Sequence, residues 1–180
     1  EAETYPFRSL AGCGVAFKLV QGIIAKQADY KINQLPEGFE KWLLDLVAIG
    51  TIADLQPLLD ENRVLVKYGL VVLQKTRRLG ILKLIENMSK NLVKIDEHVV
   101  GWQIAPRLNA AGRLGRANTA YNLLITDDAT QAQSLAEELN ETNKERQQIT
   151  EKTMAEAEII LGDIKDEKIL IAVGKDWQTG

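Results

Sequence analysis

A run of almost continuously apolar residues from Leu43 to Ile52 (LLDLVAIGTI) constrains the fold more than any other feature of the chain. A helix that is apolar on nearly every face is stable only when other elements cover it, so this segment has to be deeply buried. Pro36 and Gly38 mark a turn before the run, and we expect a helix to begin near Phe39. Pro57 closes the segment shortly after the run. The remaining segments must therefore pack around this helix.

Helical periodicity dominates the rest of the sequence. Apolar residues recur at helical spacing in the segments 10–28, 61–75, 81–92 and 118–128. Another helix is expected to begin at the acidic pair Asp96 and Glu97, because acidic residues favour a helix N-terminus. Pro106 lacks a backbone N–H and is expected to stop or bend whatever precedes it.

The longest helix is predicted to run from Asp128 to Leu161. Thr126 or Asp127 is the expected N-cap, and Gly162 is the expected C-cap. The middle of this helix, NETNKERQQITEK, is polar on nearly every face. We therefore expect that part to stand out in solvent or to span between lobes.

One strand is predicted from Lys168 to Val173 (KILIAV), because this segment is rich in isoleucine and bounded by charge and glycine. The expected fold class is mainly α, with a short β element near the C-terminus. No stretch approaches the roughly 18 apolar residues that a membrane span needs. The single cysteine, Cys13, rules out a disulfide framework and favours a reducing compartment, so we expect a cytoplasmic protein. Nothing in the sequence indicates the oligomeric state.

The segment APRLNAAGRLGR, residues 105–116, carries three arginines and no acid. No Asp or Glu occurs between Glu97 and Asp127, although the net charge of the whole chain is −3. Guanidinium groups match phosphate oxygens in pairs, and most hydrogen bonds between proteins and nucleic acids go to phosphates. The candidate nucleic-acid-binding residues are Arg107, Asn109, Arg113 and Arg116. The alternative is that the arginines cap helix C-termini, but the missing acidic partners favour binding of a polyanion.

Two aromatic residues, Trp102 and Tyr121, flank this segment and could stack on nucleobases. A tryptophan at such a position is more often part of a hydrophobic core. For Trp102 we therefore favour a place in the core.

Asp54 follows the buried run and is the first candidate for chemistry. A carboxylate carried into an apolar interior must be paired, hydrogen-bonded or bound to a metal. The alternative is a helix cap or turn residue, which spacing alone favours narrowly. Asp45, inside the run, is expected to be a partly exposed helix residue.

A two-metal phosphodiester site gathers several Asp and His ligands around cations about 4 Å apart. The chain has one histidine, His98, and no cluster of Asp and His in sequence. By itself it is therefore not expected to assemble a binuclear centre.

Three segments, in this order and at these spacings, carry a resemblance to a known family: YPFRSLAGCGVAFKL, LLDLVAIGTIADLQPLLDENRVLVKYGL and IAPRLNAAGRLG. They resemble the bacterial RecJ family, which are single-strand-specific DNA exonucleases of the DHH phosphoesterase superfamily. The likeness covers nearly the whole chain. The arginine–asparagine element is specific to RecJ-like members, whereas GTIAD is shared more loosely across the superfamily.

The resemblance implies an exonuclease that degrades single-stranded DNA from the 5′ end with Mn²⁺ or Mg²⁺, in recombination and repair. It implies that Asp54, the last residue of GTIAD, is a catalytic metal ligand. It also implies that Arg107, Asn109 and Arg113 face the DNA. No membrane partner is implied.

The family's Asp-x-Asp and Asp-His-His motifs and the glycine-rich motif of its DHHA1 domain are missing from the sequence. We therefore expect an internal piece of a two-domain α/β parent, inactive on its own. Residues 1–60 would end the DHH domain, residues 61–95 would connect, and residues 96–180 would form a RecJ-specific helical region that leads into the DHHA1 domain. Two alternatives stay open. One is a DHH phosphoesterase acting on short RNA or cyclic dinucleotides, and the other is a non-catalytic scaffold of the same fold that binds nucleic acid.

Overall fold

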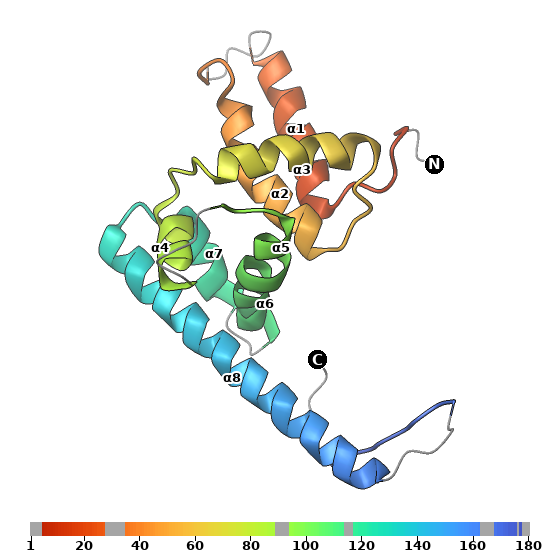
Figure 1. Cartoon of the computed structure of the whole chain (residues 1–180). Coiled ribbons are helices and arrows are strands. Elements are labelled where there is room, and N and C mark those ends of the chain that lie inside the picture. Colours follow the sequence, from red (N-terminus) through yellow and green to blue (C-terminus); the bar gives the residue numbers. More distant parts are fainter. Residues whose placement is uncertain are drawn as a thin grey trace.

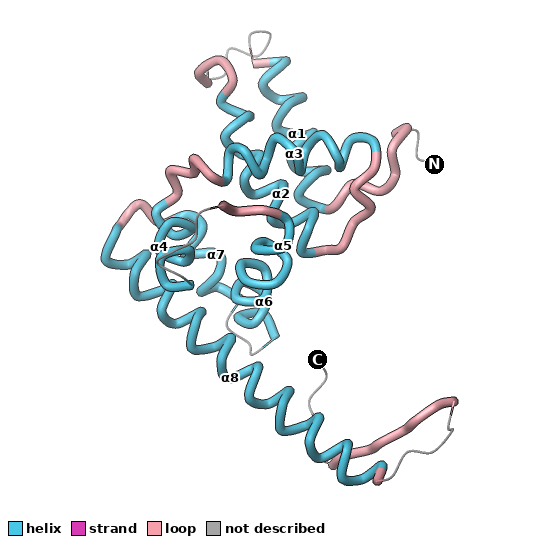
Figure 2. The backbone as a smooth tube through the Cα atoms, in the orientation of Figure 1, coloured by secondary structure: helices cyan, strands magenta, loops and turns pink. Residues whose placement is uncertain are grey.

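The computed structural model describes residues 5–27, 35–88, 94–113, 117–162, 168–175 and 177, with only the backbone described for Arg113 and Ala117. These residues form a layered assembly of helices, and no strand occurs among them (Figures 1 and 2). In chain order the elements are α1 (Gly12–Lys26), the 3₁₀-helix η1 (Phe39–Leu43), α2 (Leu44–Ala53), α3 (Asp60–Leu73), α4 (Leu79–Met88), α5 (Glu97–Val99), the π-helix η2 (Val100–Ile104), α6 (Ala105–Arg113), α7 (Ala117–Ile125) and α8 (Ala129–Leu161). The prediction of a mainly helical chain is confirmed.

Helix α2 is the buried centre that the apolar run predicts. Its residues Val47, Ala48, Ile49 and Ile52 are all buried. α1 and α3 pack against α2, and so do η2 and α6. The segment is therefore covered by elements from both halves of the chain, as a helix without a polar face requires.

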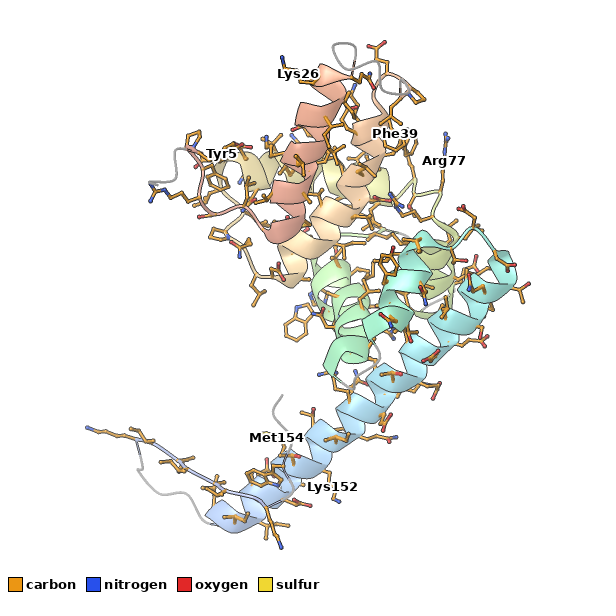
Figure 3. The ribbon with its side chains drawn as sticks, turned by 180° about the vertical axis from the view of Figure 1, so that it is seen from behind. Tyr5, Lys26, Phe39, Arg77, Lys152 and Met154 are labelled. Carbon is orange, nitrogen blue, oxygen red and sulfur yellow. The ribbon has the colours of Figure 1, made fainter. Side chains whose placement is uncertain are left out.

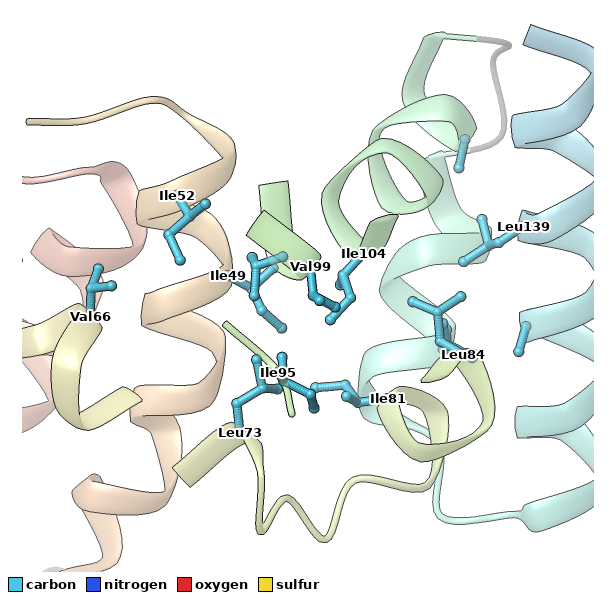
Figure 4. Close-up of a cluster of buried hydrophobic side chains, with 14 residues drawn as sticks. Ile49, Ile52, Val66, Leu73, Ile81, Leu84, Ile95, Val99, Ile104 and Leu139 are labelled. Carbon is cyan, nitrogen blue, oxygen red and sulfur yellow. The ribbon is translucent and has the colours of Figure 1, made fainter. Parts of the chain in front are cut away.

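One hydrophobic core joins α2 to α3, η2, α6 and α8 (Figure 4), whereas α1 packs through a smaller cluster formed by Phe17, Val47 and Leu65. Ile49 and Ile52 of α2 lie in this core with Ile104 of η2 and Leu139 of α8. Burial of such side chains is worth about 1.5–3 kcal/mol each, so this core holds α2 and α3 against α4, α6, α7 and α8.

Two glycines allow the closest approaches between helices. A Cβ at Gly80 of α4 would overlap the carbonyl oxygen of Leu123 in α7. A Cβ at Gly69 of α3 would overlap the backbone of Leu44 at the start of α2. Side chains at these positions would push the helices apart, so glycine sets the distance at which α4 meets α7 and α3 meets α2.

Pro106 neither stops nor visibly interrupts the helical path from Glu97 to Arg113, contrary to one expectation. The five residues before α6 form a π-helical turn instead, in which the Ala105 N–H donates to the Val100 carbonyl. A π-turn is a common way to take up a local mismatch in a helix. It accommodates a residue that cannot donate a hydrogen bond, and the chain remains helical through the proline.

Helix α8 begins one residue later than the predicted caps suggest. Asp128, and not Thr126 or Asp127, is its N-cap, because the Asp128 carboxylate accepts a hydrogen bond from the Gln131 N–H at 2.8 Å. Gly162 is the C-cap with φ of 60°, as predicted.

The polar middle of α8 is only partly solvated. Thr142 and Asn143 are buried, each with 2% of its surface exposed, on the part of α8 that packs against the other helices. Further along, α8 projects beyond the rest of the molecule, where Lys152 and Met154 lie (Figure 3). The expectation of a solvent-exposed helix therefore holds only for its C-terminal part.

The predicted strand from Lys168 to Val173 is not formed. Ile169, Ile171 and Val173 are about four-fifths exposed, and the segment pairs with no strand among the described residues. High β propensity reflects packing on a sheet, and here no sheet is available to pack on. Within the described part of the chain, no helix is long and apolar enough to cross a membrane.

Candidate nucleic-acid interface

A groove of about 530 Å³ lies where the end of α2 meets η2, α6 and α8. Its lining residues are Ile52, Ala53, Leu55, Gly101, Trp102, Ala105, Pro106, Asn109, Arg146 and Gln147. The groove therefore combines the end of GTIAD with the arginine–asparagine helix, two motifs that lie about 50 residues apart in the sequence. We refer to these ten residues as the α2–α6 groove.

Asp54 is not itself a lining residue, but its chain neighbours on both sides, Ala53 and Leu55, line the groove. It is the C-cap of α2, and its backbone N–H donates to the Gly50 carbonyl at 3.0 Å. Leu55 follows with φ of 52°, a left-handed conformation that ends the helix abruptly. This sharp end leaves Asp54 exposed rather than carried inward with the apolar run.

The position of Asp54 suits a cation ligand. The carboxylate makes no hydrogen bond or ion pair with any side chain that the structure describes. It also stands at the C-terminal, negative end of the α2 dipole, which stabilises a bound cation and does not stabilise an anion. No group of three or more His, Cys, Asp or Glu side chains gathers among the described residues, so they do not supply a full set of metal ligands there.

Arg107 of α6 is half-buried and held by neutral partners. Its Nε donates to Asn140 Oδ1 of α8 at 3.1 Å, and its Nη1 donates to the Gln103 carbonyl at 2.8 Å. Burial lowers the pKa of the guanidinium below its usual value, although it stays charged at neutral pH. No carboxylate among the described residues neutralises Arg107, so its charge acts on the surroundings of α6.

Asn109 is exposed and lines the α2–α6 groove. Arg113 is the last residue of α6, and its side chain lies outside the described part of the structure, as does the whole of Arg116. Of the four predicted binding residues, the structure therefore places only Asn109 in the groove, and Arg107 of the same helix points to Asn140 and is not a lining residue.

Trp102 does not belong to the core, contrary to our expectation. It is 74% exposed and lines the groove, while Val100 and Ile104 of the same π-helix are completely buried. The wide π-turn places those two residues inward and Trp102 outward. Its ring lies 6.0 Å from that of His98, at a tilt of 33°. Tyr121 is exposed on α7 and is not among the groove residues.

Arg146 of α8 is a groove residue that sequence reasoning missed. It lies in the polar middle of the long helix, between Glu145 and two glutamines, where nothing in the local pattern distinguishes it. Its Nε donates to Oδ1 of the buried Asn143 at 3.3 Å. Only the packing of α8 against α6 reveals that this cation shares a surface with Asn109.

Asp45 is buried with 2% of its surface exposed, and the expectation of a partly exposed residue is wrong. Its carboxylate accepts hydrogen bonds from Thr76 Oγ1 at 3.0 Å and from Arg78 Nε at 3.1 Å. Both donors belong to the connection between α3 and α4. Because a buried carboxylate has to be paired, this network fixes the connection against the start of α2.

A second cavity of about 220 Å³ adjoins Asp45 and is separate from the α2–α6 groove. Trp42, Arg77 and Arg78 line one part of it, and residues 124–127 line the other. The Arg77 guanidinium lies 4.4 Å from the centre of the Trp42 ring. This geometry stabilises the connection between α3 and α4 by a cation–π contact.

Curated relatives resemble the chain over nearly its whole length. The single-stranded-DNA-specific exonuclease RecJ of Bacillus subtilis is 42% identical over 98% of the chain, which spans 21% of that protein. The protein of the same name from Haemophilus influenzae is 39% identical over 98% of the chain, which spans 30% of that protein. The chain thus spans less than a third of the length of these relatives. No family model matches it.

Solved structures agree with the sequence relatives. RecJ of Thermus thermophilus in complex with Mg²⁺ superposes with a TM-score of 0.71, at 37% identity, over 86% of the chain and 23% of that structure. An exonuclease RecJ bound to manganese gives a TM-score of 0.72, at 36% identity, over 88% of the chain and 39% of that structure. Because sequence and fold agree over most of its length, the chain belongs to the RecJ family.

Proposed function

We propose that this chain forms part of a metal-dependent exonuclease that degrades single-stranded DNA from its 5′ end in the cytoplasm. The curated relatives are named as exonucleases specific for single-stranded DNA, and the matching structures contain Mg²⁺ or manganese. The activity belongs to the intact protein, of which the chain would supply one metal ligand and part of the DNA-binding surface. We propose that residues 1–60 of the chain end the DHH domain, that residues 61–95 connect, and that residues 96–180 form a RecJ-specific helical region.

A single observation supports this proposal most strongly. The α2–α6 groove brings the end of α2, where Asp54 stands free, next to Asn109 of the acid-free arginine segment. A nuclease needs a metal ligand beside a surface that holds the phosphate backbone, and this arrangement fits both requirements.

Asp54 and the residues of the arginine segment would have different roles. Asp54 would be one of the ligands of Mn²⁺ or Mg²⁺, and the cation, when bound, stabilises the negative charge of the phosphoryl oxygens. Arg107, Asn109, Arg113 and Arg116 would bind the phosphates and keep the strand in register. Arg107 also holds α6 against α8, so it positions the segment that carries the other three.

The test is the replacement Asp54→Asn in the intact protein, which keeps the size of the side chain and removes its charge. We expect a loss of metal-dependent cleavage of single-stranded DNA of at least 100-fold, and little change in strand binding measured without metal. Asp127→Asn is the matched control, since Asp127 is exposed and neither it nor its chain neighbours line the groove. Full activity of the Asp54→Asn variant would contradict the assigned role.

The same assay separates the two alternatives. Intact protein that hydrolyses short RNA or cyclic dinucleotides but leaves long single-stranded DNA untouched would be another kind of DHH phosphoesterase. Intact protein that binds the strand and cleaves none of these substrates, with either metal, would be a scaffold.

A further inference from the structure

Trp102 is a large aromatic side chain that the fold leaves in water. It has 74% of its surface exposed in the α2–α6 groove, although tryptophan gains more than almost any residue from burial. Neither the fold nor the proposed metal site makes use of it. An exposed tryptophan in a groove is therefore a candidate for contact with a ligand.

The backbone holds Trp102 rigidly in this exposed position. Val100 and Ile104, on either side of it in η2, are completely buried and fix the π-turn in the core. A Cβ at Gly101 would lie 3.6 Å from Ile52, which shows how closely η2 rests on α2. A residue on so fixed a turn loses little backbone freedom when it binds, so the point from which the ring projects is preorganised.

The charge of the groove selects an anionic ligand. Among the described residues, Arg146 is the one charged residue that lines it, Asn109 and Gln147 add amides, and the Asp54 carboxylate is adjacent in sequence but not part of the lining. The hydrogen bond from Arg146 Nε to the buried Asn143 orients the guanidinium and leaves its Nη groups available. An aromatic ring beside a cation and amides matches a nucleotide, which combines a flat base with a phosphate.

The size of the groove agrees with this ligand. Its volume of about 530 Å³ lies within the range of sites for small molecules, which is about 300–1,000 Å³. Such a groove can take one or two unpaired nucleotides, whereas the bases of a duplex are stacked and unable to reach the ring.

We propose that Trp102 is a stacking platform for an unpaired nucleobase of single-stranded DNA, with Arg146 binding the adjoining phosphate. This inference rests on the proposed function and deepens it, because it assigns a contact to the base and not only to the backbone. Stacking is nearly independent of base identity, so the platform would prefer single strands over duplex without reading sequence.

The test compares two ligands that differ only in their bases. An oligothymidylate and an abasic strand with the same number of phosphates are titrated into the intact protein in metal-free buffer, where no cleavage occurs. Loss of one stacked base by alanine substitution costs about 1–3 kcal/mol, or roughly 5- to 150-fold in affinity. Trp102→Ala should lose this factor for oligothymidylate and retain the wild-type affinity for the abasic strand, whereas Trp102→Phe should keep most of the affinity.

Arg146→Gln should weaken binding of both strands equally, because it removes a phosphate contact. Tyr68→Ala is the matched control, since Tyr68 is an exposed aromatic residue of α3 outside the groove, and it should change neither affinity. A Trp102→Ala variant that binds oligothymidylate as tightly as wild type overturns the proposal. So does one that loses affinity equally for both strands.

A second measurement does not depend on the stability of the alanine variant. Oligothymidylate should quench part of the tryptophan fluorescence of the wild-type protein, and Trp102→Phe should abolish that part. Quenching that persists at the wild-type amplitude in Trp102→Phe contradicts the proposal. Because binding is measured without metal, base-dependent binding by a protein that lacks nuclease activity would refute only the proposed function.

Discussion

Arg107 Nε donates to Asn140 Oδ1 at 3.1 Å and so ties α6 to α8 through a charged donor and a neutral acceptor. Its second partner, the Gln103 carbonyl, is neutral too. The guanidinium therefore stabilises the fold without losing its charge to a carboxylate. This arrangement lets one side chain hold the helix pair together and still attract a polyanion.

The two roles of Arg107 can be separated by three variants of the intact protein. Arg107→Ala should lower the free energy of unfolding by about 1–3 kcal/mol, because two hydrogen bonds to a charged group are lost. It should also weaken binding to single-stranded DNA. The slope of log affinity against log salt concentration should fall by about the amount that one phosphate contact contributes. Arg107→Lys should keep that slope and lose part of the stability. Lysine keeps the positive charge but lacks the forked guanidinium that donates both hydrogen bonds.

Asn140→Ala is the matched control, because it removes the acceptor and leaves every charge in place. It should lower the unfolding temperature and leave the salt dependence unchanged. An Arg107→Ala variant with the wild-type salt dependence would reduce Arg107 to a purely structural residue.

Local pattern is sufficient to predict most of the helices, but not α6, which begins beside Pro106, and not the pairings between helices. Spacing of apolar residues located the buried helix α2 because its lack of a polar face demands cover on all sides. Asp45 was misjudged because its partners, Thr76 and Arg78, are 31 and 33 residues further along the chain. The segment 168–173 has strand-like composition, yet composition does not supply the neighbouring strand that a ladder needs.

In the candidate site, too, some residues are recognisable from the local sequence and others only from the packing of the helices. The arginine segment stands out in sequence because it lacks acids, a property that needs no structure to recognise. The sequence places Trp102 wrongly in the core and does not single out Arg146, because their exposure in one groove depends on a π-turn and on how α8 crosses α6. Functional residues with no distinctive local pattern are found only when packing brings them together.

The buried carboxylate of Asp45 gives a prediction about stability. Removing one member of a buried ion pair leaves the other uncompensated, which costs about 3–5 kcal/mol when both are fully buried. The Arg78 side chain is 27% exposed, so water screens part of this cost. We expect Asp45→Ala to lower the free energy of unfolding by about 2–3 kcal/mol in urea titrations of the purified protein.

Thr76→Val provides the comparison, since it removes one donor to Asp45 and keeps the shape of the side chain. It should cost about 1 kcal/mol. A double variant, Asp45→Ala with Arg78→Ala, should be less destabilised than the sum of its parts. Strict additivity would show that the pair contributes no coupling energy.

Glu61 joins the N-terminal segment and α1 to the start of α3. Its carboxylate accepts a hydrogen bond from Tyr5 Oη at 2.8 Å and lies 2.5 Å from Lys18 Nζ. The hydrogen bond with Lys18 is the main reason that the pKa of Glu61 is lowered from its usual 4.5. The same hydrogen bond raises the pKa of Lys18 above its usual 10.5.

These shifts predict how stability depends on pH at both extremes. Because the pKa of Glu61 is lower in the folded state, its contribution is complete above about pH 4.5 and is lost as pH falls through the folded value. The contribution of Lys18 is lost as pH rises above about 10.5. Glu61→Gln should therefore be less stable than wild type by up to about 1 kcal/mol at pH 7, with the difference shrinking as the pH falls below 4.5 and through the folded pKa of Glu61. Glu86→Gln, in the exposed pair with Lys83, is the control, and an acid-independent difference for Glu61→Gln measured by thermal unfolding would disprove the linkage.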